Sequence, residues 1–129
     1  MSTIGHPLSD LSNLLTPYTF AVDPPNSSLS SRTVHAFSAS ASTPGLPFRS
    51  QCIFWYAEIA GWDPSLERGW GDAFGVFRNS VITQGIAARY ALRQASSEKA
   101  KEHGMLMGPF GEFVWGLVAR LKDRDKSKL

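Results

Sequence analysis

The chain has 129 residues, a formal net charge of +2, 43% hydrophobic residues and a single cysteine. This length and apolar content are enough for one domain with a buried core, whereas the small net charge argues against nucleic-acid binding, which needs clustered positive charge. One cysteine excludes an internal disulfide, and the longest apolar runs, CIFWYA and FVWGLVA, are too short to span a membrane.

A short helix is predicted near the start of the chain. Ser9 or Asp10 can cap it, because short polar side chains accept hydrogen bonds from free backbone N–H groups. Pro17 would limit it, because proline lacks the backbone donor that a helix interior needs. Its apolar residues are Leu11, Leu14 and Leu15.

Residues 22–47 form the least periodic part of the sequence. They are rich in proline and serine, and this composition predicts a long surface loop. A helix is expected from Ser50 to Ala60, ended by Gly61, and Asp63 or Ser65 can cap the element that follows. The residues of this helix available to a core are Ile53, Phe54, Tyr56 and Ala57.

The strongest helical pattern lies between Trp70 and Gln94, where apolar residues recur at three- and four-residue steps. A further helical stretch is expected from Ser97 to about Gly104, and a last helix from about Pro109. No stretch alternates in the way that a half-buried strand does, so the prediction is an all-α fold. The stripe residues of the two long helices are Phe74, Phe77, Val81, Ile82, Gly85, Ala88 and Leu92, then Phe110, Phe113, Val114, Leu117, Val118 and Leu121.

Few residues carry a recognisable catalytic pattern. His6, His35 and His103 are far apart, and none lies at ligand spacing from another histidine, cysteine or carboxylate. The glycines do not form a phosphate-binding loop, and no serine lies in a nucleophile elbow. We therefore assign no catalytic and no metal-binding residue from the sequence.

Several sequence blocks nevertheless resemble one family. STIGHPLSDLSNLL, PGLP, WYAEIAGWDP and FGVFRNSVITQGIAARYALRQASSEKA are similar to the aminoglycoside phosphotransferase and choline kinase-like family. They are most similar to the phosphotransferase-type domain fused to certain acyl-CoA dehydrogenases. The resemblance covers most of the chain except residues 23–43 and the final tail, and QGIAARY followed by QASS is its most specific element. It implies that residues 1–129 are a single helical C-terminal portion, the C-lobe segment of a protein-kinase-like fold that lacks the ATP-binding lobe.

The resemblance implies ATP and magnesium as cofactors of the full-length family, but none in this chain. The family's ATP-binding lobe, catalytic loop and metal motif would all precede Met1, which would then be an internal methionine of a longer ancestor. The chain would be the substrate-side portion of an ATP-dependent phosphotransferase acting on a hydroxyl group, with a hydroxyacyl-CoA as the guess for the acceptor. Alone it should be inactive and bind no magnesium–ATP. The alternative is a non-catalytic helical interaction module or remnant.

The resemblance also suggests roles for particular residues. Asp10 matches the family's aspartate that supports the catalytic loop, although it can equally be a carboxylate in the first turn of a helix. Gly5 and Pro7 would shape the turn before that helix. The candidates for acceptor binding are Gln84, Arg89 and Tyr90. The alternative is that they form hydrogen bonds within the lobe and that the arginine snorkels.

The C-terminal tail, residues 124–129, is expected to be solvated and frayed. It ends in Ser127, Lys128 and Leu129, a tripeptide that the peroxisomal import receptor recognises when it is free and extended. This motif predicts a peroxisomal matrix protein, with a cytoplasmic location as the alternative. Removal of the family's strands would expose the leucines of the first helix, which predicts self-association.

Overall fold

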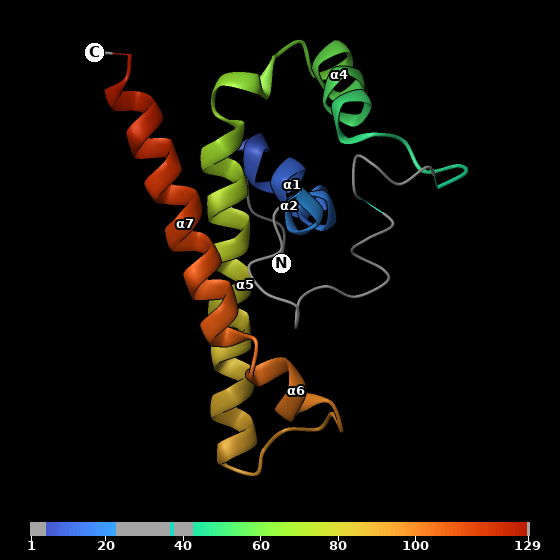
Figure 1. The fold of residues 1–129 in the computed structure, drawn as a ribbon. Coiled ribbons are helices and arrows are strands. Elements are labelled where there is room, and N and C mark those ends of the chain that lie inside the picture. Colours follow the sequence, from blue (N-terminus) through green and yellow to red (C-terminus); the bar gives the residue numbers. More distant parts are fainter. Residues whose placement is uncertain (1–4, 23–36, 38–42, 129) are drawn as a thin grey trace. The chain divides into compact units, whose positions relative to one another are not determined.

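The computed structural model describes residues 5–22, 37 and 43–128 (Figure 1). Within these residues every regular element is a helix, so the predicted all-α class is confirmed. The chain separates into two compact units, Met1–Asp72 and Ala73–Leu129. The predicted loop 22–47 lies mostly outside the described residues, apart from Val22 at the end of a helix, Phe37, and a turn that begins at Thr43.

The first unit opens with helix α1 (Pro7–Leu14). Its cap is His6, not Ser9 or Asp10 as predicted: His6 Nδ1 accepts a hydrogen bond from the Leu8 N–H at 3.2 Å. A histidine Nδ1 that carries no proton can accept a hydrogen bond, as the side-chain oxygen of a serine or aspartate cap does. Pro7 follows as the first helical residue, a position where the missing N–H costs nothing.

Pro17 does not end the helical run, contrary to the prediction. It is the second residue of α2 (Thr16–Val22), which begins one residue after α1 ends. The first turn of a helix has no intrahelical partner for its N–H groups, so a proline is accepted there. Thr16 Oγ1 donates to the carbonyl of Ser12 at 2.9 Å, which links the two helices across the break.

The core of the first unit joins α1, α2 and α4 (Arg49–Ala60) through Leu11, Leu15, Tyr18 and Ile53. The predicted exposed patch on the first helix is therefore wrong for Leu11 and Leu15, because α2 and α4 cover them; Leu14 alone of the three is exposed, at 73%. The Tyr18 hydroxyl donates to the carbonyl of Pro47 at 2.5 Å. Burial, followed by the neighbouring Cys52, raises the pKa of Tyr18.

Helix α4 ends where the sequence predicts. Gly61 adopts a left-handed backbone with φ 66°, and its N–H donates to the carbonyl of Ala57. Asp63 then caps the short helix η1 (Pro64–Leu66), and its carboxylate accepts from the N–H of Ser65 at 2.9 Å. The Ser65 hydroxyl also donates to this carboxylate at 2.5 Å, and the hydroxyl and backbone hydrogen bonds together lower the pKa of Asp63. Phe54, expected in the core, is exposed.

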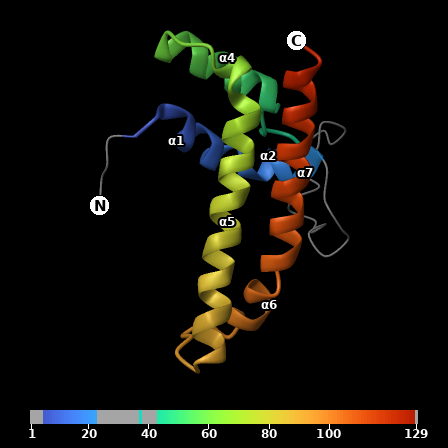
Figure 2. The ribbon, with the colours of Figure 1, turned by 90° about the vertical axis from the view of Figure 1, so that its left-hand side faces the viewer.

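Helix α5 (Arg68–Ala91) begins in the first unit and continues into the second. In the second unit it lies antiparallel to α7 (Met107–Lys126), and the short α6 (Ala100–Gly104) lies near the end of α5 (Figures 1 and 2). Close approaches are made at glycines: a Cβ on Gly104 would lie 3.0 Å from the Cα and Cβ of Ala87. The buried apolar side chains of this unit are Ala73, Val76, Ala100, Phe110, Phe113 and Leu121.

The apolar stripe of α5 does not form the core that its periodicity indicates. Phe74, Phe77 and Val81 are 51%, 52% and 49% exposed, whereas Val76 and Thr83 on another face of the helix are buried. The helix was predicted correctly, but it turns small and polar residues inward. We call Phe74, Phe77 and Val81 the α5 stripe.

The last helix runs further than predicted, because α7 includes residues 124–126 of the expected tail. The N–H of Ser127 donates to the carbonyl of Asp123 at 3.0 Å, and that of Lys128 donates to the carbonyl of Asp125 at 3.3 Å. The basic residues of the last turn favour this extension, because they lie at the negative end of the helix dipole. Leu129 lies outside the described residues.

Candidate functional site

The segment after α5 is held in a defined turn. The Gln94 N–H donates to the carbonyl of Arg89 at 2.8 Å, and the Arg93 N–H donates to the carbonyl of Tyr90 at 3.0 Å. These two bonds form a Schellman motif, in which the residue at the Arg93 position is usually glycine. Arg93 has φ 56°, which costs a non-glycine residue on the order of 1 kcal/mol. The structure thus fixes the backbone leading into the next loop.

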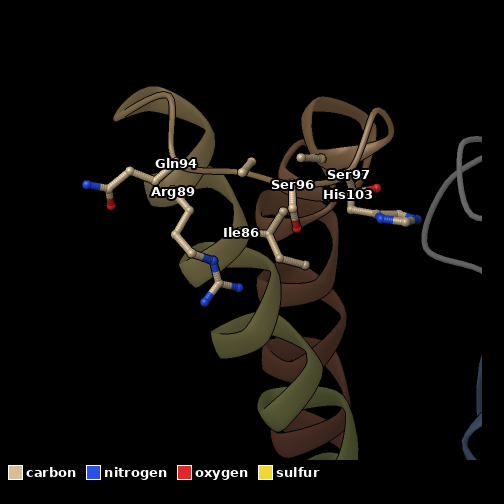
Figure 3. Close-up of a pocket in the computed structure, with 8 residues that line it drawn as sticks. Ile86, Arg89, Gln94, Ser96, Ser97 and His103 are labelled. Carbon is tan, nitrogen blue, oxygen red and sulfur yellow. The ribbon is translucent and has the colours of Figure 1, made fainter.

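A cavity of about 350 Å³ lies between this turn and α6 (Figure 3). Ala100, only 3% exposed, and the half-buried Ile86 supply apolar walls. Five side chains in the lining can donate hydrogen bonds, and no carboxylate lines the cavity. The lining residues are Ile86, Arg89, Gln94, Ala95, Ser96, Ser97, Ala100 and His103.

The close-up shows which donors face the cavity. The guanidinium of Arg89 and the side chain of Ser96 approach Ile86 from the two sides, whereas Gln94 and His103 extend outward in opposite directions (Figure 3). Ser97 Oγ accepts a hydrogen bond from the Lys99 N–H at 3.2 Å, which holds the loop before α6. Arg89 and Ser96 are therefore the donors best placed for a ligand.

A second hollow, of about 530 Å³, lies beside the same loop and shares Ala95 and Ser97 with the cavity. Its lining includes the exposed Tyr90 and Arg93, together with Glu98. Because Glu98 brings a negative charge to this hollow, it suits a neutral or zwitterionic group better than an anion.

The structure separates the three predicted acceptor-binding residues. Arg89 lines the cavity, Tyr90 lines the second hollow, and Gln84 is exposed further up α5. At about 100° per residue, positions five and six apart point in different directions, so the three do not form one cluster. Their proposed role in acceptor binding stays a prediction. Ser96, Ser97 and His103 were not predicted as site residues; the signal that could have found the serines is their place in a loop after a long helix, because binding residues are often on loops.

The residues predicted near the N-terminus lie in and before α1. Asp10 is exposed in its first turn, where a carboxylate is favoured by the helix dipole. Pro7 is the first residue of the helix, and Gly5 is exposed ahead of it. The catalytic-loop role suggested for Asp10 stays a prediction.

A buried ion pair that the sequence did not predict ties the first unit together. Arg49 Nη2 lies 2.5 Å from both carboxylate oxygens of Asp72, and the two side chains are 20% and 11% exposed. Thr19 Oγ1 donates to Asp72 Oδ1 at 3.4 Å. The pair joins α2, α4 and the start of α5, and we interpret it as a structural cluster.

Two carboxylates of the first unit are held by neighbouring side chains or backbone groups: Asp72 is engaged by Arg49 and Thr19, and Asp63 by Ser65. Among the residues that the structure describes, no group of three or more histidine, cysteine, aspartate or glutamate side chains could hold a metal ion. None of the described helices is both long and apolar enough to cross a membrane.

Comparison with known proteins links the chain to one named relative. It is 31% identical over 114 residues to acyl-CoA dehydrogenase family member 11 from Pongo abelii. The similarity covers 87% of this chain, whereas the chain spans 14% of the length of that relative. No family model matches the chain, and no solved structure matches it.

Proposed function

We propose that the chain is the C-terminal, substrate-side helical portion of an ATP-dependent small-molecule phosphotransferase and is inactive alone. The observation that carries the proposal is the similarity over 114 residues to acyl-CoA dehydrogenase family member 11. The resemblance of QGIAARY and QASS to a phosphotransferase-type domain supports it. The parent reaction would transfer phosphate from ATP to a hydroxyl group, and the relative's name favours a hydroxyacyl-CoA as the acceptor.

In this proposal the chain orients the acceptor and supplies no catalytic group. Arg89 and Tyr90 lie at the end of α5, beside two hollows with room for parts of a ligand. Phosphoryl transfer depends on positioning and on neutralisation of charge. A cationic donor such as Arg89 can position the acceptor without holding the nucleotide.

The α5 stripe is the surface through which the chain would meet the rest of this enzyme. Two phenylalanines and a valine about half exposed on one helix face are unusual for a surface helix, whose exposed side is normally polar. The relative is about seven times as long as the aligned segment, so it carries additional chain that could cover such a face. We therefore propose that the rest of the full-length phosphotransferase covers the α5 stripe.

Phe77→Asp should weaken this association at least about tenfold, because burial of a phenylalanine is worth roughly 2 kcal/mol and a buried unpaired charge costs more. The measurement is the dissociation constant between the chain and the relative expressed without the segment that aligns with this chain. Met105→Asp is the matched control, since Met105 is exposed and lies outside the stripe. Equal binding by wild type and Phe77→Asp would contradict the assignment.

The alternative is a helical interaction module, and the same stripe favours it. Here the stripe would pair with a second copy of the chain and no phosphotransferase partner would be needed. Sedimentation velocity separates the two functions: a concentration-dependent dimer abolished by Phe77→Asp supports the module. A monomer that binds the relative expressed without the aligned segment supports the first proposal.

We also propose a peroxisomal location through recognition of Ser127, Lys128 and Leu129 by the import receptor. Ser127 and Lys128 are exposed and lie just beyond α7, so unwinding the last turn would present them at little cost. A fluorescent protein fused to the N-terminus should give punctate peroxisomal fluorescence. Deletion of Leu129 should make the fluorescence diffuse. Diffuse signal from both versions would contradict the proposal.

A further inference from the structure

We propose that the cavity between the end of α5 and α6 binds a phosphomonoester group. The choice rests first on the chemistry of its lining: the guanidinium of Arg89 and the hydroxyl of Ser96 face the cavity, Ser97 lies beside them, and no carboxylate lines it. A phosphate dianion needs several donors and a positive charge nearby. The cavity supplies both.

Arg89 is the central residue of this site. Its planar guanidinium presents paired N–H donors that match two phosphate oxygens, which a lysine cannot do. In Figure 3 the guanidinium lies beside Ile86, across from the loop that carries Ser96. Ile86 and the buried Ala100 form the apolar part of the lining, whereas Arg89 and Ser96 are exposed, so a ligand can reach both donors from solvent.

The backbone holds these donors in place before a ligand arrives. The Gln94 N–H and the Arg89 carbonyl are hydrogen-bonded at 2.8 Å, so the helix end that carries Arg89 and the loop that carries Ser96 are joined directly. The left-handed Arg93 closes this turn. Preorganisation of this kind lowers the ordering cost of binding.

The surrounding charges add a favourable field. From residue 89 to residue 103 the sequence has four basic side chains, Arg89, Arg93, Lys99 and Lys101, against two acidic ones, Glu98 and Glu102. Of these six side chains only Arg89 lines the cavity, and the five around it include three basic and two acidic groups, so the local balance is positive. An excess of positive charge beside a hollow attracts anionic ligands.

The phosphomonoester has two possible sources, free phosphate and a larger ligand that carries the group. Coenzyme A is the larger ligand tested, and that choice alone rests on the proposed function. It carries a 3′-phosphomonoester, whereas dephospho-coenzyme A retains only the pyrophosphate. Comparison of the two therefore isolates the group that the cavity is proposed to hold.

The experiment is a titration of the ¹⁵N-labelled chain with inorganic phosphate, coenzyme A and dephospho-coenzyme A, followed by NMR. Sodium chloride at matched ionic strength controls for screening. We expect saturable shifts at Gln94, Ser96 and Ser97 with phosphate and with coenzyme A. Binding should weaken about tenfold or more in Arg89→Gln and several-fold in Ser96→Ala, because each loses a charged hydrogen bond. Lys122→Gln, which removes an exposed charge on α7, should bind as the wild type does.

The outcomes separate this inference from the proposed function. Saturable phosphate binding that is lost in Arg89→Gln supports the site, even where coenzyme A does not bind; that second result would count against an acyl-CoA acceptor. Shifts with none of the three probes would overturn the site. Phosphate binding that is equal in wild type, Arg89→Gln and Ser96→Ala would also overturn the site. The same holds if phosphate does not bind and coenzyme A and dephospho-coenzyme A bind equally.

Discussion

Asp72→Ala should lower the free energy of unfolding by about 3 kcal/mol or more, the cost of removing one partner from a buried ion pair. The change leaves the Arg49 guanidinium charged and largely buried. Its Nε is already buried without a hydrogen-bond partner among the described residues. It also removes one of the two acceptors within reach of the Thr19 hydroxyl, leaving the Leu15 carbonyl at 3.5 Å. Urea unfolding followed by circular dichroism gives the free energy directly.

Two further variants test whether the buried unpaired charge causes the loss of stability. Arg49→Met combined with Asp72→Leu should recover most of the lost stability, because an apolar pair leaves no buried charge. Asp63→Ala removes an exposed cap carboxylate and should cost much less stability than Asp72→Ala. If Asp72→Ala cost no more than Asp63→Ala, the pair would contribute nothing that the structure assigns to it.

Gly71→Ala should destabilise the chain by roughly 2 kcal/mol, because this glycine of α5 is in close contact with α1. A Cβ at Gly71 would lie 2.7 Å from Leu8 Cγ and closer still to Ser12 Oγ. Both neighbours are buried side chains of α1 and cannot move into solvent. Alanine can be accepted only if α1 shifts away from the start of α5.

Gly85→Ala is the matched control on the same helix. A Cβ there would meet nothing within 4 Å, so the better helix propensity of alanine should raise stability by up to about 1 kcal/mol. Thermal unfolding of both variants measures the contrast. A stabilising Gly71→Ala would mean that α1 does not pack against this residue as described.

The helices could be predicted because their periodicity is local, but what covers each face could not. The repeat at Phe74, Phe77 and Val81 shows that these side chains share one side of a helix. It does not say whether that side meets a core, a partner or water, and in this structure the side is exposed. The same limit applies to Leu11 and Leu15, which a neighbouring helix buries.

The candidate site was predicted in part for a related reason. Arg89 and Tyr90 could be named because a family resemblance pointed to their helix. Ser96 could not, because it reaches the cavity only through a turn that requires a left-handed arginine, which sequence rules reserve for glycine. The ion pair between Arg49 and Asp72 joins positions on separate helices, and no local pattern reports such a pairing.

One chimera tests the proposed function most directly. The aligned segment of acyl-CoA dehydrogenase family member 11 is replaced by the matching residues of this chain. Transfer of labelled γ-phosphate from ATP to a hydroxyacyl-CoA is then measured. We expect transfer by the chimera, none by a version without the segment, and none by the chain alone. A folded chimera that fails to transfer phosphate, or a version without the segment that transfers it unaided, would contradict the account.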